Sequence, residues 1–237
     1  MNNHISKHLF FVRHGQASFG EANYDNLSQQ GWQQSELLGQ ALKKDHHNFQ
    51  KIFSGPHQRH FQTFQGIEKG YGEKMSSCET IQGFAENQLM EIAMYFIPKM
   101  LNSDLPAQAI FKQMPIENRD GEFLKLFQQV AKKWMKNELD LSEKKFESYP
   151  DFLSRIEKTI AYLDSATNSG DNVLIVTSGG TITAVYALAT QCSDEEILKL
   201  NFGIKNVSVT DFNYYNNTLD LKTFNKSYLP KEFETYI

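Results

Sequence analysis

The chain has 237 residues, of which 40% are hydrophobic and 22% are charged, so it holds enough apolar material for a sizeable core and is not a disordered chain. Its formal net charge is −4, and its longest basic run is a Lys-Lys pair. Nucleic acids are held by clustered Lys and Arg side chains, so no nucleic-acid partner is expected. No apolar run approaches the length of a membrane span, and residues 1–12 lack a signal-peptide pattern. We expect a cytoplasmic protein in which Cys78 and Cys192, far apart in the sequence, are both reduced.

The first 70 residues predict two strand–helix units. Residues 9–12 are a short continuous apolar run, which is typical of a buried strand in a parallel sheet. Ser28 is a suitable N-cap, and apolar residues then recur at helical spacing, so we expect a helix to about residue 44. Residues 51–54 predict a second strand, and a proline follows it where a helix over about 57–69 would begin.

Residues 85–150 have a different character from the segments that flank them. Pro98, Pro106 and Pro115 separate short helical segments. Residues 121–136 have a helical period. The apolar face of that helix would consist of Phe123, Leu126, Phe127, Val130 and Trp134. We interpret the block as a helical insertion that covers one side of the sheet.

The rest of the chain returns to strand–helix alternation. We expect a helix over about 151–166, a clear strand at 173–176, and a helix over 181–190 after the glycines that end this strand. Residues 206–212 and 219–224 flank a turn of tyrosines and asparagines, which predicts a closing β-hairpin.

This order of elements predicts the architecture. Strands that are apolar throughout and alternate with helices indicate a three-layer α/β/α fold with a mostly parallel, doubly wound sheet. We expect one domain over residues 1–237, with the helical insertion at about 85–150 and a C-terminal antiparallel hairpin. The hairpin also offers an edge on which two copies could pair as a homodimer.

Three apolar strands run directly into polar or glycine-rich residues that lead into a helix, at residues 12–15, 53–56 and 176–180. In an open α/β sheet such strand ends gather on one edge, and ligands bind there. Glycines permit close approach of a backbone, and the N-termini of helices present N–H groups to anions. The pattern therefore favours an anionic ligand.

The side chains at these strand ends suit a phosphate ester. Arg13 lies beside His14, and Arg59 follows the second strand end by about one helical turn. Two guanidinium groups can grip phosphate oxygens and neutralise charge that grows during phosphoryl transfer. An imidazole nitrogen can attack phosphorus, which gives a phosphohistidine that water then discharges.

Four segments resemble, in order, the motifs of the histidine phosphatase superfamily, also called the phosphoglycerate mutase-like family. They are Phe11-Val12-Arg13-His14-Gly15-Gln16, Leu27-Ser28-Gln29-Gln30-Gly31, Ser54-Gly55-Pro56-His57-Gln58-Arg59-His60-Phe61-Gln62-Thr63 and Asn206-Val207-Ser208-Val209-Thr210. The resemblance extends from about residue 8 to residue 224, apart from the insertion.

The resemblance implies roles for particular residues. His14 would be the phosphorylated nucleophile, and Arg13 and Arg59 would bind the phosphate, with hydrogen bonds from Gln16 and Ser18. The family's proton donor is a glutamate soon after the third strand, here at about 80–81.

Glu86 is our choice for that donor over Glu91, which lies five residues on and could instead face solvent on the following helix. Either glutamate must be protonated to give a proton to the leaving alkoxide. Phe19 and Tyr24 are candidates for the mouth of the pocket.

The chain departs from the family at the late strand, where a second histidine normally bonds the transferring phosphoryl group. Here Ser178 stands in its place and is followed by Gly179. All seven histidines lie in the first 60 residues, so a substitute could come only from there, with His57 and His60 as the candidates. Ser178 and Gly179 would still bind phosphate, but loss of one preorganised donor typically costs about 10²–10³ in rate.

We therefore predict phosphomonoester hydrolysis through a phosphohistidine at His14, without metal or cofactor, on a small phosphorylated substrate. Phosphoglycerate mutase activity is the weaker reading, because nothing in the sequence indicates the means of retaining a phosphoenzyme. The alternative from another class is a non-catalytic or weakly catalytic protein that binds a phospho-ligand and regulates, having kept Arg13 and Arg59 but lost fast turnover.

Overall fold

The structure is a computed structural model that describes residues 6–18, 25–113 and 116–236, with backbone alone for 116–120. The strands are β1 (Lys7–Arg13), β2 (Lys51–Ser54), β3 (Cys78–Thr80), β4 (Asn172–Thr177), β5 (Val209–Tyr215) and β6 (Thr218–Lys226). The helices are α1 (Gln29–Lys44), α2 (Gln58–Tyr71), α3 (Leu89–Met100), α4 (Ala107–Gln113), α5 (Ile116–Met135), α6 (Tyr149–Ala166), α7 (Gly179–Thr190) and α8 (Asp194–Gly203), with 3₁₀ turns at Gln82–Phe84 and Lys231–Phe233.

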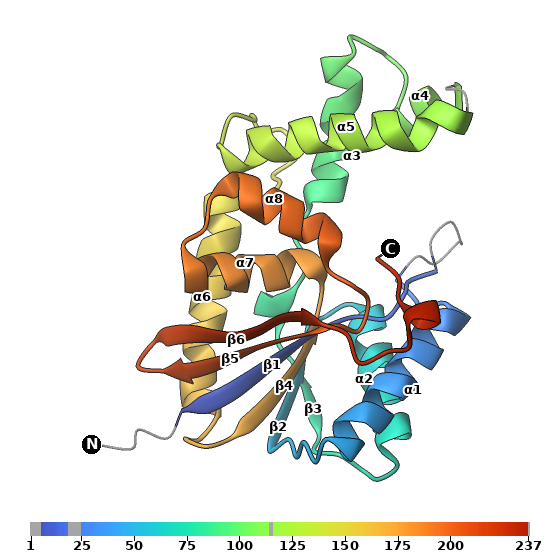
Figure 1. Ribbon diagram of the computed structural model, residues 1–237. Coiled ribbons are helices and arrows are strands. Elements are labelled where there is room, and N and C mark those ends of the chain that lie inside the picture. Colours follow the sequence, from blue (N-terminus) through green and yellow to red (C-terminus); the bar gives the residue numbers. More distant parts are fainter. Residues whose placement is uncertain (1–5, 19–24, 114–115, 237) are drawn as a thin grey trace.

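The six strands form one sheet in the order β3-β2-β4-β1-β5-β6. β3, β2, β4 and β1 are parallel, and β5 and β6 are antiparallel to their neighbours. Helices α1 and α2 lie on one face of the sheet, and α6 and α7 lie on the other (Figure 1). This arrangement confirms the predicted α/β fold with its mostly parallel sheet and C-terminal hairpin.

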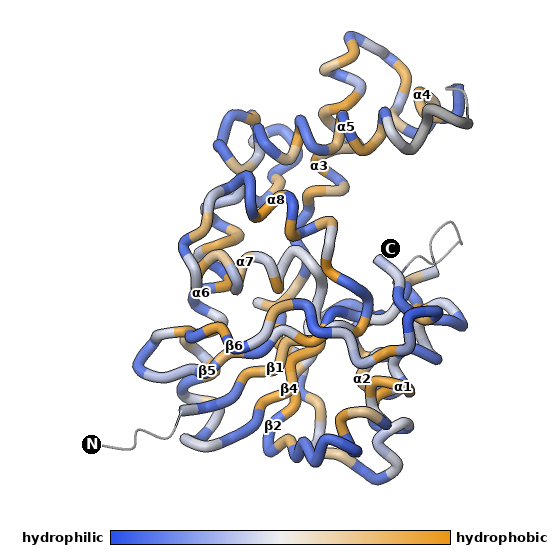
Figure 2. Tube along the Cα trace, viewed as in Figure 1, coloured by the Kyte–Doolittle hydropathy of each residue, from blue (hydrophilic) through white to orange (hydrophobic). Residues whose placement is uncertain are grey.

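The central strands are apolar on both faces because each face packs against helices. In β1, Leu9 and Phe11 belong to the core under α6 and α7, whereas Phe10 and Val12 belong to the core under α1 and α2. β4 divides in the same way. Figure 2 shows the continuous apolar colour of these inner strands. Two cores therefore fix the register of β1 and β4, because a slip of one residue would exchange the two sets of side chains.

The segment predicted as a helical insertion is helical. α3 packs against both α4 and α5, and Phe111 of α4 contacts Phe123 of α5. Four of the five residues predicted for the apolar face of α5 are buried, namely Leu126, Phe127, Val130 and Trp134. The expectation that the insertion covers one side of the sheet is wrong. α5 packs on α8 and α6, so the insertion extends the molecule beyond α8 (Figure 1).

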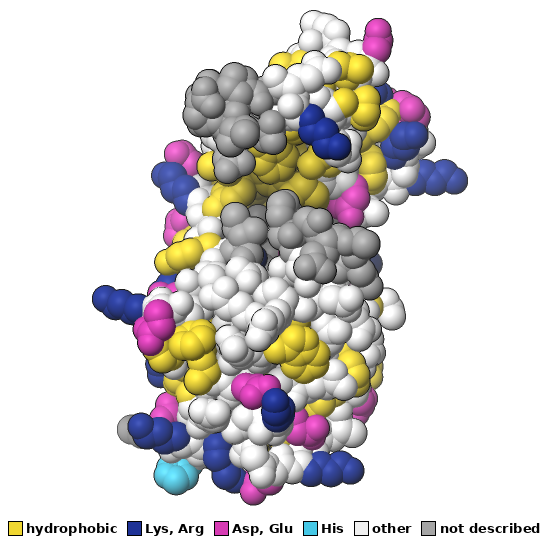
Figure 3. Space-filling view, turned by 90° about the vertical axis from the view of Figure 1, so that its right-hand side faces the viewer, with side chains coloured by type: hydrophobic (Ala, Val, Ile, Leu, Met, Phe, Trp, Pro, Cys, Tyr) yellow, Lys and Arg dark blue, Asp and Glu magenta, His cyan; other side chains and the backbone are white. Residues whose placement is uncertain are grey.

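Hydrophobic side chains gather on the surface where the insertion meets the rest of the molecule (Figure 3). Large apolar side chains exposed on the insertion and on α8 include Leu101, Leu105, Leu124 and Phe202. The insertion therefore presents much apolar surface among its charged residues.

Two elements differ from the sequence-based expectation. α8 was not predicted. The strand expected from residue 206 begins only at Val209, as β5, because residues 206–207 form a turn in which Val207 has a left-handed backbone (φ 49°). Within the described residues, none of the helices combines the length and the apolar character that crossing a membrane requires. Cys78 and Cys192 are free thiols.

Candidate active site

The three glycine-rich strand ends meet at one edge of the sheet. β4 lies between β1 and β2, so Arg13 pairs with Thr177 in register and Ser54 pairs with Val176. The pairing of β1 with β4 extends one residue beyond β1, because the amide of His14 donates to the carbonyl of Thr177 (2.9 Å). The predicted juxtaposition of these strand ends is thus present in the structure.

His14 is buried, with 6% of its surface exposed, and its ring is held in one orientation. Its Nδ1 atom lies 2.8 Å from the carbonyl oxygen of Gly15, which can only accept, so Nδ1 carries the proton and Nε2 carries a lone pair. Burial lowers the pKa of His14 well below its usual value, and the charges of Arg59 and Arg13 lower it further. The ring is therefore neutral at neutral pH, with a nucleophilic nitrogen.

Close backbone approach places the loop that follows His14. A Cβ atom on Gly15 would overlap the backbone of Gly31 in the first turn of α1, and a Cβ atom on Gly31 would overlap Gln16. The amide of Gly15 donates to Oγ1 of Thr63 on α2 (2.9 Å). Gly31 and Thr63, which come from two separate motifs, therefore hold the loop after His14 close to α1 and α2.

Gln16 is also fixed in this loop. Its side-chain oxygen accepts from Oγ of Ser28, the N-cap of α1 (2.8 Å), and its backbone amide donates to Gln34 (2.9 Å). The structure therefore gives Gln16 a role in joining the loop to the start of α1. Phe19 and Tyr24, the candidates for the mouth of the pocket, lie outside the described residues.

The two arginines bond to different parts of the chain. Arg59, in the first turn of α2, pairs with Asp25 (2.6 Å) and donates from its second nitrogen to Oγ of Ser178 (3.4 Å). Arg13 donates to the carbonyl oxygens of Ile204 and Tyr236, the latter at 2.8 Å. Both guanidinium groups act electrostatically on His14 and are held in place by bonds to other parts of the chain.

Glu86 lies in the segment between the 3₁₀ turn Gln82–Phe84 and α3, and its carboxylate contacts the start of α7 at the end of β4. One carboxylate oxygen accepts from the amide of Gly180 (3.2 Å), and the other accepts from the amide of Asn87 (2.9 Å). A Cβ atom on Gly180 would overlap the Glu86 carboxylate, so the second glycine of this strand end makes room for it. Glu91, by contrast, is exposed in the first turn of α3.

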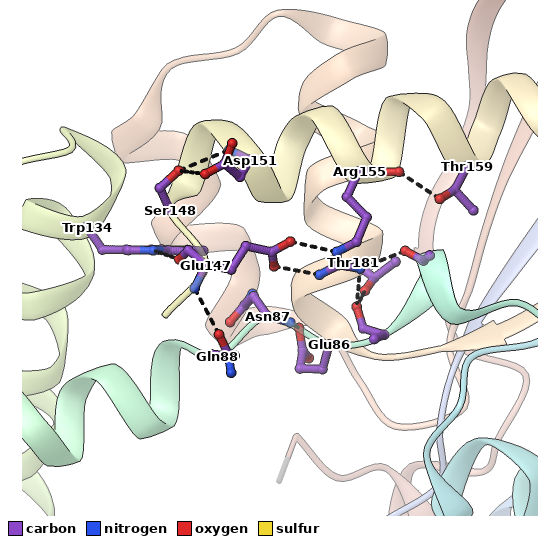
Figure 4. A network of polar contacts seen from close by, with 12 residues as sticks. Glu86, Asn87, Gln88, Trp134, Glu147, Ser148, Asp151, Arg155, Thr159 and Thr181 are labelled. Atoms are coloured by element: carbon purple, nitrogen blue, oxygen red, sulfur yellow. Dashed lines mark hydrogen bonds and ion pairs between the residues drawn. The ribbon is translucent and has the colours of Figure 1, made fainter. Parts of the chain in front are cut away.

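A polar network that the sequence analysis did not identify holds the loop of Glu86 (Figure 4). Arg155 of α6 makes two bonds to the carboxylate of Glu147, each 2.7 Å long. The same guanidinium donates to the carbonyl oxygens of Gly83 (2.7 Å) and Ala85 (3.1 Å). The backbone on the N-terminal side of Glu86 is therefore anchored to α6.

We expect Arg155→Ala to reduce kcat about tenfold or more, because small misplacement of a reacting group is costly and the variant releases the Glu86 loop. It should also lower the free energy of unfolding by about 1–3 kcal/mol, because a half-buried Glu147 loses its partner. The matched control is Lys158→Ala, an exposed position on the same helix. Steady-state kinetics and urea denaturation measure both effects, and equal kcat for the two variants would contradict this role.

Ser178 and Gly179 begin α7 at the end of β4. Oγ of Ser178 makes no capping bond to α7 and instead lies 2.6 Å from Nε2 of His60. The two histidines considered as substitutes have rings in contact with each other (centroids 5.0 Å apart) but bond to different groups. His60 lies at Ser178 with its ring centroid 5.7 Å from that of His14, whereas Nε2 of His57 accepts from the backbone amide of Glu86 (3.3 Å).

The free energy of unfolding should fall as the pH drops below about 6.5, the ordinary pKa of histidine. The pKa values of His14 and His60 are both lowered well below that value, chiefly by burial. The unfolded chain therefore binds more protons than the folded one in this range, and stability is lost at up to about 1.4 kcal/mol per pH unit for each ring. Urea denaturation from about pH 7.5 to about pH 5 measures the slope. His60→Phe should make the slope shallower, and an unchanged slope would contradict the assignment.

Among the described residues, no group of three or more His, Cys, Asp or Glu side chains is arranged to hold a metal ion. The polar groups gathered at the sheet edge are a neutral histidine, two arginines, a carboxylate and a helix N-terminus. Such a set suits an anion that receives or gives up charge during a reaction.

The fold and this edge define an α/β protein of the phosphate-handling class, and the comparisons narrow the class to a family. The model of the histidine phosphatase superfamily (branch 1) matches residues 9–95 and 114–227. The chain belongs to this superfamily. No curated protein shows a significant match to the chain.

Solved structures with the same fold include phosphatases and a mutase. Phosphoglycerate mutase from Bacillus anthracis str. Sterne is 20% identical with a TM-score of 0.64, over 94% of this chain and 96% of that one. A putative alpha-ribazole-5'-P phosphatase from Escherichia coli str. K-12 is 16% identical (TM-score 0.62; 94% and 97% covered). Phosphoserine phosphatase from Entamoeba histolytica, in complex with 3-phosphoglyceric acid, is 21% identical (TM-score 0.57; 93% and 97% covered). At these identities the likeness concerns the fold.

Proposed function

We propose that this protein is a phosphomonoesterase that uses Nε2 of His14 as its nucleophile. The observation that carries the proposal is the state of His14, which is buried and neutral, has its proton on Nδ1, and lies in the field of Arg13 and Arg59. A neutral imidazole with a fixed tautomer is the form that can attack phosphorus.

In the first step, Nε2 of His14 forms a bond to phosphorus while the bond from phosphorus to the ester oxygen breaks. Arg13 and Arg59 bind the phosphoryl oxygens, and Ser178 and the N-terminus of α7 at Gly179 add hydrogen bonds to them. The leaving alkoxide takes a proton, for which Glu86 is the donor.

In the second step, water attacks the phosphohistidine. The carboxylate left at Glu86 takes a proton from that water, the bond from phosphorus to Nε2 breaks, and inorganic phosphate leaves with His14 and Glu86 restored. All of these groups come from the chain, so the cycle uses no metal or cofactor. A phosphatase is favoured over a mutase because a mutase must retain its phosphoenzyme, and nothing in the sequence indicates how it would do so.

The substrate class is supported by relatives of the same fold. One Entamoeba histolytica structure contains phosphoserine, and another contains 3-phosphoglyceric acid. A small phosphorylated molecule of this kind would place its dianion at the sheet edge and its remaining part toward the insertion.

The second candidate function is a binder of phosphorylated ligands with slow turnover. Ser178 at the late strand end favours it, since a neutral hydroxyl replaces a ring that can carry charge. Hydrolysis of 4-nitrophenyl phosphate, measured together with calorimetric binding of inorganic phosphate, separates the two functions. Turnover supports the phosphatase, whereas saturable phosphate binding without turnover supports the binder.

A further inference from the structure

The site contains a second buried histidine ring that comes from α2. His60 has no exposed surface, and its Nε2 atom lies 2.6 Å from Oγ of Ser178. Its ring centroid lies 5.7 Å from that of His14. A histidine therefore does stand beside the nucleophile, although the strand end itself carries a serine.

The surroundings of His60 are built to accommodate the ring. A Cβ atom on Gly55 would overlap Nδ1 of His60, so this strand-end glycine leaves the space that the ring occupies. On the other side the ring reaches the hydroxyl of Ser178, and a larger side chain at 178 would compete for the same volume. Gly55, His60 and Ser178 thus form one complementary set.

The hydrogen bonds at Ser178 determine whether its hydroxyl can donate to a ligand. Burial lowers the pKa of His60 well below its usual value, and Arg59 and His57 lower it further, so the ring is neutral and has one proton to place. Nδ1 of His60 has no hydrogen-bond partner among the described residues. We therefore place the proton on Nε2, so that Oγ of Ser178 accepts from His60 and from Arg59 (3.4 Å). Because the hydroxyl oxygen then accepts twice, its own proton points elsewhere and can be donated to a phosphoryl oxygen.

We propose that His60 is a positioning residue that acts through Ser178, orienting the serine hydroxyl as a hydrogen-bond donor to the transferring phosphoryl group. Histidine and serine together would then supply the bond that the late strand end alone does not. This inference rests on the proposed function, because it concerns the same phosphoryl group.

The first test compares variants that keep or lose a donor at the Nε2 position. His60→Phe keeps a ring of similar size without a donor, whereas His60→Gln keeps an amide that can donate to Ser178. We expect His60→Phe to lower kcat by about 10- to 100-fold with little change in KM. This is less than the about 10²–10³ that loss of a whole donor costs, because the Ser178 hydroxyl remains and loses only its orientation. His60→Gln should recover most of that loss. A His60→Gln variant as impaired as His60→Phe would overturn the proposal, since packing alone would then explain the effect.

A double-mutant cycle tests whether His60 acts through Ser178. If it does, His60→Phe/Ser178→Ala should be no slower than Ser178→Ala alone, because the second change removes a bond that is already lost. Losses that multiply would show independent roles and overturn the proposal. His47→Ala is the matched histidine control, because His47 follows α1 and its ring contacts Phe10 and Phe49.

The same variants are titrated with orthovanadate by calorimetry, which separates failure of the inference from failure of the proposed function. Should the wild type bind but not turn over 4-nitrophenyl phosphate, the phosphatase proposal fails, and vanadate affinity becomes the readout for His60. The inference then expects weaker binding by His60→Phe and near wild-type binding by His60→Gln. Equal affinity in all variants would overturn it.

An exchange of positions gives an independent check. Ser178→His alone should be poorly active because its ring competes with His60 for one volume. Ser178→His combined with His60→Ala should be at least about tenfold more active than Ser178→His alone, since removal of one ring makes room for the other. Equal activity of the two variants would contradict the shared volume on which the proposal depends.

Discussion

His14→Ala is expected to abolish turnover of phosphate monoesters, with kcat lower by at least about 10⁴, because no other group can take the place of a covalent nucleophile. Binding of inorganic phosphate should survive, since Arg13, Arg59 and the N-terminus of α7 remain. Hydrolysis of 4-nitrophenyl phosphate from about pH 5 to about pH 8 provides the measurement.

His47→Ala is the control for this experiment, since it removes a histidine whose ring contacts Phe10 and Phe49 and that has no part in the proposed site. Circular dichroism checks that both variants are folded. A His14→Ala variant that keeps wild-type activity would exclude nucleophilic catalysis by this residue, whatever the affinity for phosphate.

Glu86→Gln should have the second largest effect, and its size should depend on the leaving group. A general acid contributes about 10²–10⁴ in rate when the leaving oxygen needs a proton. An alkyl phosphate such as phosphoserine leaves a basic alkoxide, so we expect a loss in this range. 4-Nitrophenolate leaves as a stable anion, so the loss with 4-nitrophenyl phosphate should be much smaller.

Glu91→Gln is the matched control, because Glu91 is exposed on α3 and Glu86 contacts the start of α7. It should leave kcat unchanged with both substrates. If Glu91→Gln were the variant that depends on the leaving group, the proton donor would be assigned wrongly. Equal losses of Glu86→Gln with both substrates would indicate that Glu86 supports the fold of the site and does not give the proton.

Local patterns predicted most of the elements of the sheet and its covering helices. Ser28 accepts from the amide of Gly31 as the predicted N-cap, and β2 spans Lys51–Ser54 as predicted. The continuous apolar runs of β1 and β4 predicted strands buried on both faces, which the two cores confirm. α8 escaped prediction because only Ile197 and Leu198 among its ten residues are buried, too few to produce a helical period.

The juxtaposition of the three strand ends could be predicted because strand ends and glycines are visible in a sequence, whereas long-range partners are not. Arg155 binds carbonyl groups about 70 residues away, and no local pattern marks it. Asp25 is likewise recognisable only through its contact with Arg59. Adjacent residues on a helix point in different directions, so sequence alone did not indicate that Arg59 and His60 both reach Ser178.

The most direct test of the account is to trap the phosphorylated enzyme. The wild type is mixed with ³²P-labelled phosphoserine, quenched during turnover under alkaline conditions that preserve phosphohistidine, digested and analysed by mass spectrometry. We predict one acid-labile phosphoryl group on His14, formed and discharged at rates that match kcat and absent from His14→Ala. Turnover without a phosphoenzyme, or a label on any other residue, would contradict the account.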